Sequence, residues 1–351
     1  MDMHTAHEAT AEAGHDLSRR DILTAGLGLG IAAGLTAFLP GLAGVASAAA
    51  RSSAPRHKQV YVEVSALSSL AYFIDHRLGM TLAGRDLGVT TQYVGPSNLD
   101  LTAMLNIIDQ KIAQKVSGLL VVGFDPILKS GIDKAVNAGI PVATLDADVP
   151  DSKRQIFLGT GNVNVGKLGG QLLAQAIGGK GKVAIITRIG QSNLEERVAG
   201  YKATLARYPH IQLVQVANDD SDSVKAASVV GSILRTHPDM AGIACVEAAG
   251  GVGAATAVQE AGKVGKVKII SMDRDDQTLN FIQRGVILAS TAQKTALMSY
   301  LGTLILYYYT NHPVPIVSNN AAAHVTPLPA SVDTGTIVIT KDNAHFFYHK
   351  K

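Results

Sequence analysis

Short apolar runs alternate with longer amphipathic ones along most of this chain, and this alternation constrains the fold more than any other feature. It begins with the apolar run at residues 60–64 and the amphipathic stretch at residues 72–87. Short strands separated by helices of about 10–15 residues favour a parallel sheet covered by helices on both faces. We expect strands at 60–64, 89–94, 118–122, 141–145 and 155–158, and helices at 72–87, 101–115 and 127–138.

The pattern then starts a second time, from a helix at residues 165–177 to a strand at residues 288–292. Between them we expect strands at 182–187, 211–217, 242–246 and 267–272, and helices at 195–207, 221–236, 253–261 and 277–285. Two successive α/β sets predict two doubly wound parallel-sheet lobes with a cleft between them. The repetition is one of pattern only, since no sequence repeat is visible.

A long helix at residues 295–310, a proline-rich connection and a last strand at residues 336–340 complete the chain, and we interpret this part as crossing between lobes. Hinge crossings are expected near residues 159–161, near residues 293–295 and between residues 322 and 332. The expected division is an N-terminal lobe of residues 58–160 plus 294–322, a C-terminal lobe of residues 161–293 plus 330–342, and a tail of residues 343–351.

The first 50 residues have the composition of an export signal. Arg19 and Arg20 precede an apolar run at residues 22–39, and a small-residue tract ends before Arg51. A charged region, an apolar region and an A-x-A end are typical of a cleaved signal, and the adjacent arginines resemble the twin-arginine signal. We interpret residues 1–50 as a twin-arginine export signal and expect the protein in the periplasm. The alternatives are an uncleaved membrane anchor and a soluble helix, which the glycines of this run would weaken.

The composition excludes several classes of protein. With 47% hydrophobic and 17% charged residues the chain is not disordered. A net charge of +3 without a block of lysine or arginine argues against a nucleic-acid surface. The single cysteine, Cys245, cannot form an internal disulfide, and we expect it to be a buried strand residue. Beyond the signal, no apolar run reaches the roughly 18 residues of a membrane span.

Acidic side chains directly follow three of the expected strands. They are Asp125, Asp146 and Asp273. In open α/β sheets, ligands bind beyond the carboxyl ends of the strands. The sequence therefore predicts a ligand site near these three carboxylates.

Six short motifs occur in the order in which one known family has them. They are Ala138-Gly139-Ile140-Pro141-Val142 before Asp146, Gly159-Thr160-Gly161-Asn162, Glu196-Arg197 before Gly200-Tyr201, Gly251-Val252-Gly253-Ala254-Ala255, Ile269-Ile270-Ser271-Met272-Asp273 and Ala289-Ser290-Thr291-Ala292-Gln293. Together they resemble the periplasmic sugar-binding proteins of the ribose-binding type, solute receptors of ABC importers. The resemblance covers residues 60–293, and more loosely the remainder. It implies the type I periplasmic binding protein fold, with two lobes joined by a hinge of crossing strands.

The resemblance also implies ligand contacts at matching positions. Asp146 and Asp273 would accept hydrogen bonds from sugar hydroxyls, Arg197 would donate them, and Gln293 could do either. Charged partners strengthen each hydrogen bond to about 1.5–3 kcal/mol. Asn162, at the crossing into the second lobe, is a further candidate. Tyr72 and Phe73 match an aromatic pair, of which we expect at least one to stack on the sugar ring.

Two departures from the family pattern leave the ligand open between a monosaccharide and another polyol, such as an inositol or a sugar alcohol. Where the family often has an Asn-Asp pair, this chain has Glu247, which either takes the Asn position or points into solvent. The Asn/Pro-rich segment before the aromatic pair is replaced by Ser68-Ser69-Leu70-Ala71. Asp148 and Arg154 are expected to form an ion pair at the lobe edge rather than to contact the ligand.

The sequence predicts no catalytic residue, metal ligand or cofactor. The glycines at 159, 161 and 166 follow a strand but lack the spacing and the acidic partner of a dinucleotide fingerprint. His345 and His349 would suit a metal only on a helix, and we expect them to be solvated tail residues. No G-x-S-x-G elbow occurs.

We therefore predict an exported, monomeric solute-binding protein that captures a small sugar or polyol and delivers it to an ABC permease in the membrane. Two alternatives are a periplasmic sensing module that presents sugar to a chemoreceptor or histidine kinase, and an exported enzyme acting on a sugar. A sugar-responsive repressor would share the fold but would carry an N-terminal helix-turn-helix in place of the export signal.

Overall fold

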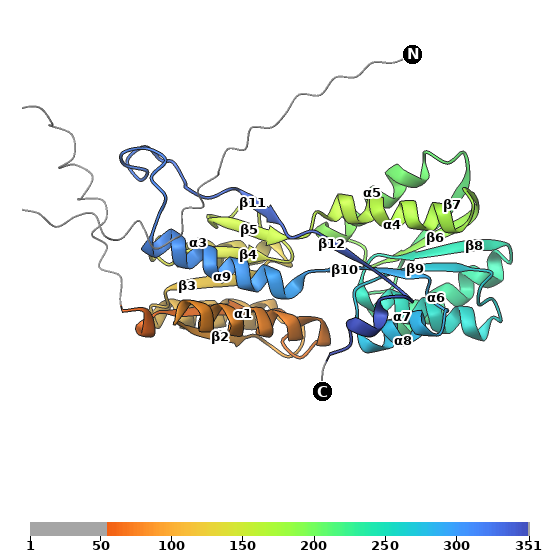
Figure 1. The fold of residues 1–351 in the computed structure, drawn as a ribbon, viewed down its shortest axis with the longest axis horizontal. Coiled ribbons are helices and arrows are strands. Elements are labelled where there is room, and N and C mark those ends of the chain that lie inside the picture. Colours follow the sequence, from red (N-terminus) through yellow and green to blue (C-terminus); the bar gives the residue numbers. More distant parts are fainter. Residues whose placement is uncertain (1–54, 350–351) are drawn as a thin grey trace, which may run out of the picture. The chain divides into compact units, whose positions relative to one another are not determined.

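The computed structural model describes residues 55–349, so the predicted export signal lies outside the described residues. Within them the chain forms two six-stranded sheets, each flanked by helices (Figure 1). The predicted fold class, two α/β lobes with parallel sheets, is confirmed. Among the described helices, none has the length and apolar character needed to cross a membrane.

The first sheet consists entirely of parallel pairs. Its strands, in spatial order, are β11 (Ser331–Asp333), β5 (Ile156–Gly159), β4 (Val142–Leu145), β3 (Gly118–Val122), β1 (Val60–Val64) and β2 (Thr90–Val94). Strand β3 is buried along its whole length, as expected for a parallel sheet covered on both faces. The helices of this lobe are α1 (Ile74–Leu87), α2 (Leu101–Ala113), α3 (Lys129–Asn137) and α9 (Thr295–Asn311).

The second sheet repeats the topology of the first. Its order is β12 (Thr336–Thr340), β10 (Ala289–Gln293), β9 (Lys268–Met272), β8 (Met240–Cys245), β6 (Lys180–Thr187) and β7 (His210–Asn218), with only β12 antiparallel to its neighbour. Its helices are α4 (Asn162–Ala176), α5 (Ser192–Leu205), α6 (Ser223–Thr236), α7 (Ala248–Glu260) and α8 (Asp276–Gln283). Strands β4 and β9 therefore hold equivalent places in the two lobes.

The chain passes between the two sheets after β5, after β10 and after β11. The third passage differs from the expectation, because Ser331–Asp333 pairs with β5 of the first sheet. The passage lies at Thr334 and Gly335, and the amide of Thr334 donates to the carbonyl of Gly159 at 2.8 Å, beside the first passage. The assignment of residues 330–342 to the C-terminal lobe was therefore wrong for β11, a three-residue edge strand too short to show a periodic pattern.

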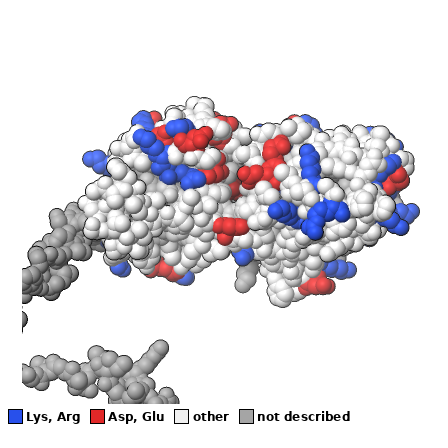
Figure 2. Space-filling model, turned by 90° about the horizontal axis from the view of Figure 1, so that it is seen from above, with Lys and Arg blue, Asp and Glu red and all other residues white. Residues whose placement is uncertain are grey.

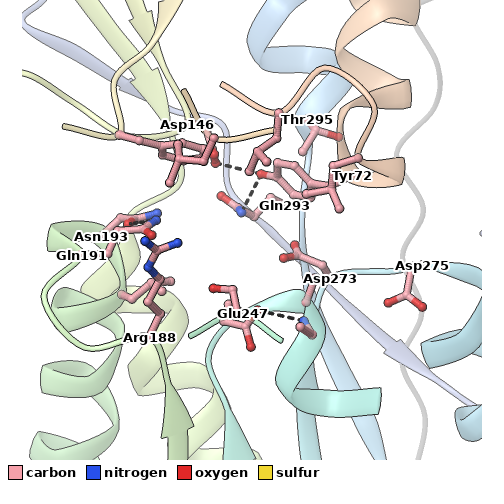
Figure 3. Close-up of a pocket in the computed structure, with 18 of the residues that line it drawn as sticks. Tyr72, Asp146, Arg188, Gln191, Asn193, Glu247, Asp273, Asp275, Gln293 and Thr295 are labelled. Carbon is pink, nitrogen blue, oxygen red and sulfur yellow. Dashed lines mark hydrogen bonds between the residues drawn. The ribbon is translucent and has the colours of Figure 1, made fainter. Parts of the chain in front are cut away.

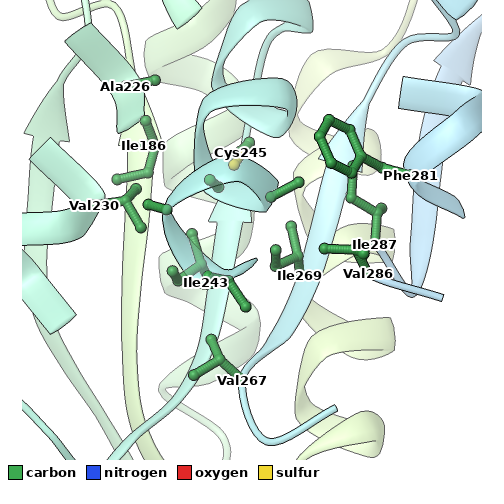
Figure 4. Close-up of a cluster of buried hydrophobic side chains, with 14 of the residues drawn as sticks. Ile186, Ala226, Val230, Ile243, Cys245, Val267, Ile269, Phe281, Val286 and Ile287 are labelled. Atoms are coloured by element: carbon green, nitrogen blue, oxygen red, sulfur yellow. The ribbon is translucent and has the colours of Figure 1, made fainter. Parts of the chain in front are cut away.

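The core of the second lobe packs the sheet against α6, α7 and α8. Ile186, Ile243 and Ile269 contribute from three neighbouring strands, and Val230 packs against them from α6 (Figure 4). Cys245 lies in the same cluster and is 1% exposed, which confirms it as a buried strand residue. Burial among apolar side chains raises the pKa of its thiol.

Helices α4 and α5 approach each other closely at two glycines. A Cβ atom at Gly166 would lie 2.0 Å from the carbonyl oxygen of Arg197, and one at Gly200 would lie 2.2 Å from the carbonyl oxygen of Val163. We expect Gly166→Ala to lower the unfolding free energy by about 1–3 kcal/mol, because the backbone must shift to admit the methyl group. Thermal denaturation should show a melting temperature lower by several degrees.

The matched control is Gly231→Ala in α6, where the nearest atom to an added Cβ is the Nη1 atom of Arg235 at 3.5 Å. Alanine favours a helix over glycine by about 1 kcal/mol, so the control should be neutral or slightly stabilising. Equal melting temperatures for the two variants would contradict the close packing of α4 on α5.

Candidate functional site

A cavity of about 610 Å³ lies at the carboxyl ends of both sheets and is lined by side chains from both lobes (Figure 3). The polar side chains that line it include Tyr72, Asp125 and Asp146 of the first lobe, and Arg188, Gln191, Asn193, Arg197, Glu247, Asp273 and Gln293 of the second. This is where an open α/β sheet places its ligand. In Figure 2, acidic side chains gather near the junction of the two lobes, with lysine and arginine on either side.

Asp146 and Asp273 occupy equivalent positions in the two lobes, each directly after its strand. Both have left-handed backbones, with φ of 64° and 65°. The amide of Asp146 donates to the carbonyl of Leu158 at 3.0 Å, and that of Asp273 donates to the carbonyl of Thr291 at 2.8 Å. A left-handed conformation costs a non-glycine residue about 1 kcal/mol or more, and such strain concentrates at functional sites. Both carboxylates line the cavity, which makes it the candidate functional site.

A chain of hydrogen bonds joins the end of β10 to Asp146. The Nε2 atom of Gln293 donates to the hydroxyl of Tyr72 at 2.7 Å, and that hydroxyl donates to Oδ1 of Asp146 at 2.8 Å (Figure 3). Burial, and then the charge of Asp146, raise the pKa of Tyr72, so its hydroxyl keeps its proton. The Oε1 atom of Gln293 is buried and has no hydrogen-bond partner.

Arg197 brings a buried positive charge to the cavity from α5. It is 2% exposed, its Nε donates to Oδ1 of Asn162 and its Nη1 donates to the carbonyl of Val246, each at 2.9 Å. Its Nη2 atom is buried without a partner. Leaving a buried donor without a hydrogen-bond partner costs about 1–3 kcal/mol of stability, and more when the donor is charged. Two hydrogen bonds therefore orient the guanidinium of Arg197, and one of its donor atoms has no partner within the described chain.

Glu247 caps the N-terminus of α7 rather than pointing into solvent, and it is 8% exposed. Its carboxyl accepts hydrogen bonds from the amides of Ala249 and Gly250 at 2.8 and 2.6 Å. Burial, and then the fully buried Asp219 beside it, raise its pKa to about 8. Burial also raises the pKa of Asp273 to about 7, against the opposing charge of Arg197. Both carboxyls thus titrate near neutral pH.

Two of the predicted contacts do not line the cavity. Phe73 is 1% exposed and its ring packs edge-on against Tyr72 and Phe124, with centroids 4.9 and 6.3 Å apart. Asn162 lies behind Arg197 and orients its guanidinium. Asp125 lines the cavity, but its Oδ1 also accepts from the amide of Ile127 at 2.9 Å.

Other residues that line the cavity were not predicted from the sequence. Arg188 and Gln191 lie between β6 and α5, and Asn193 is the second residue of α5. Arg188 follows directly after a strand, the same signal that indicated the acidic residues. The expectation that His349 is a solvated tail residue was wrong, because it lines the cavity 3.6 Å from Oδ1 of Asp75. Asp148 and Arg154 form an ion pair, as predicted. Within residues 55–349, no three His, Cys, Asp or Glu side chains are grouped to hold a metal ion.

A family model described as a periplasmic binding protein domain matches residues 63–312, most of the described chain. The chain belongs to this family. Its fold, with two α/β lobes and a cavity between their strand ends, is the one that the sequence motifs implied, and the predicted resemblance is confirmed.

Relatives of this periplasmic binding protein are sugar-binding proteins. It is 27% identical over 247 residues to the D-allose-binding periplasmic protein of Escherichia coli K12, covering 67% of this chain and 79% of the relative. It is 36% identical to the structure of AraP, an arabinose binding protein from Geobacillus stearothermophilus, with a TM-score of 0.77 over 83% of this chain and 99% of that one. A sugar-binding protein of a sugar ABC transporter from Bacillus halodurans is 34% identical, with a TM-score of 0.77 over 83% of this chain and 100% of that one.

Proposed function

We propose that this periplasmic binding protein is exported, captures one small sugar or polyol between its lobes, and delivers it to an ABC permease in the membrane. The observation that carries the proposal is the pair of buried atoms without partners at the cavity, Nη2 of Arg197 and Oε1 of Gln293. One is a donor and the other an acceptor. A sugar hydroxyl both donates and accepts, so a polyhydroxylated ligand satisfies both.

The ligand would be held from both sides of the cleft. Asp146 and Tyr72 offer polar contacts from the first lobe, and Arg197 and Asp273 offer them from the second. Because all four contacts form only when the lobes are closed around the ligand, binding shifts the population toward the closed form. The crossings after β5, β10 and β11 would act as the hinge. The closed monomer would then dock on the permease.

The remaining parts of the proposal rest on the sequence and the family. We propose that residues 1–50 are a twin-arginine signal and that the protein works in the periplasm, where this family acts. A sensing role would use the same cavity, and nothing in the site favours it. The relatives are sugar-binding proteins, which supports binding rather than catalysis.

A thermal-shift screen of the mature chain, from Arg51, against pentoses, hexoses, inositols and sugar alcohols tests the proposal. A ligand at about 100 times its dissociation constant adds about 2.7 kcal/mol to the unfolding free energy. The melting temperature should then rise by several degrees with at least one compound. Folded protein that shifts with none of them would overturn the assignment of a small sugar or polyol.

A further inference from the structure

The C-terminal tail, residues 343–349, lies beyond the segment matched by the family model yet reaches the ligand cavity. It is fixed to the second lobe. Ala344 is fully buried, and Phe347 and Tyr348 pack against the core of that lobe. The hydroxyl of Tyr348 also donates to Oδ1 of Asn280 in α8 at 2.8 Å. The tail is thus packed against the second lobe as part of its structure.

Arg274 joins this tail to the first lobe. It follows Asp273 after β9, and its Nη1 donates to the carbonyl of Phe347 at 2.5 Å. Its Nη2 forms an ion pair with Oδ2 of Asp75, the second residue of α1. The two ends of one planar guanidinium therefore hold the tail and a helix of the opposite lobe together.

Asp75 has further contacts besides the ion pair with Arg274. The hydroxyl of Thr295, just after the β10 crossing, donates to Oδ2 at 3.2 Å. The Nε2 atom of His349 lies 3.6 Å from Oδ1, while its Nδ1 lies 3.7 Å from Asp276 of α8. Asp75 is only 8% exposed, so these side chains, rather than solvent, provide most of its polar contacts. A segment of each lobe, a hinge crossing and the tail meet at this one carboxylate.

We propose that the C-terminal tail and Arg274 form a brace that ties the second lobe to Asp75 and restricts the angle between the lobes. Asp75, Arg274, Thr295 and His349 all line the cavity, so the brace also forms one wall of the site. The brace limits the open forms of the protein. Releasing it would broaden the range of lobe angles and weaken ligand binding, because the binding-competent form would be less populated.

Distances between spin labels in the ligand-free chain test the brace. Ser130 in α3 and Ser228 in α6 are exposed, one on each lobe, and can be replaced by cysteine for labelling, whereas Cys245 is buried. We expect Asp75→Asn to broaden the distribution of interlobe distances about twofold, because the neutral amide loses the ion pair with Arg274. Arg274→Lys should give an intermediate width, since an ammonium cannot hold both partners as a planar fork does.

The matched control is Asp342→Asn, which removes one carboxylate from an exposed position just before the tail. Its distance distribution should equal that of the unchanged protein. If a chain truncated after Asn343 folds, it should show the same broadened distances as Asp75→Asn. If it does not fold, Asp75→Asn and Arg274→Lys still test the brace. Identical distributions for Asp75→Asn and Asp342→Asn would overturn the brace. The distances are measured without ligand, so this test does not depend on the proposed function. If no sugar binds, the proposed function is wrong, but the distance measurements still test the brace.

Discussion

Arg197→Gln is expected to weaken sugar binding about 100-fold or more, the largest effect of any single substitution in the site. Truncating one partner of a buried, hydrogen-bonded charge costs about 2–5 kcal/mol. Arg197 is held by Asn162 and the carbonyl of Val246, so its remaining donor is already oriented toward the cavity. Titration calorimetry with the sugar that gives the largest thermal shift measures the loss.

The matched control for this substitution is Arg207→Gln, an exposed arginine just beyond the end of α5. It removes the same charge from the same lobe and should leave the dissociation constant unchanged. The melting temperature of each variant without ligand must be measured too, because Arg197→Gln leaves Val246 and Asn162 without their donor. A folded Arg197→Gln protein with the affinity of the control would show that Arg197 does not contact the ligand.

The stability of the unchanged protein is expected to fall as the pH rises from about 4.5 toward about 8. Glu247 has its pKa raised from 4.5 to about 8 by burial and by Asp219, so the folded chain keeps a proton that the unfolded chain has lost. Stability falls with pH wherever the folded state binds more protons. Asp273, with a pKa of about 7, changes stability in the same direction.

Glu247→Gln tests how much of the pH dependence of stability comes from Glu247. The amide has no proton to lose, can still accept from an amide at the start of α7, and can donate to the partnerless Oδ2 of Asp219. Melting temperatures from about pH 5 to about pH 9 should therefore fall by several degrees less in the variant than in the unchanged protein. Parallel curves for the two proteins would show that Glu247 ionises in the folded state at its ordinary pKa.

The sequence was sufficient to predict those parts of the fold and site that depend on repeated local patterns. Alternating apolar runs predicted two wound sheets, because each buried parallel strand must be apolar throughout and each crossover needs a helix. The rule that ligands lie beyond strand ends indicated Asp146 and Asp273, which line the cavity. Their left-handed backbones could not be predicted, since they occur together with hydrogen bonds to a neighbouring strand that form only in the folded sheet.

Features that depend on packing between distant segments were not predictable. Phe73 and Tyr72 are adjacent aromatic residues, and only the tertiary structure shows that one is buried while the other lines the cavity. Asn162 was expected to contact the ligand, but it contacts Arg197 from a neighbouring helix. His349 reaches Asp75 across more than 270 residues of sequence. Local sequence patterns do not predict contacts between such distant residues.

The most direct test of the central claim is a calorimetric titration of the mature protein with the sugar or polyol that stabilises it most. We predict saturable binding of one ligand per chain, weakened about 100-fold or more in Arg197→Gln and unchanged in Arg207→Gln. No saturable binding by the folded protein, or equal binding by both variants, would contradict a sugar site between the lobes.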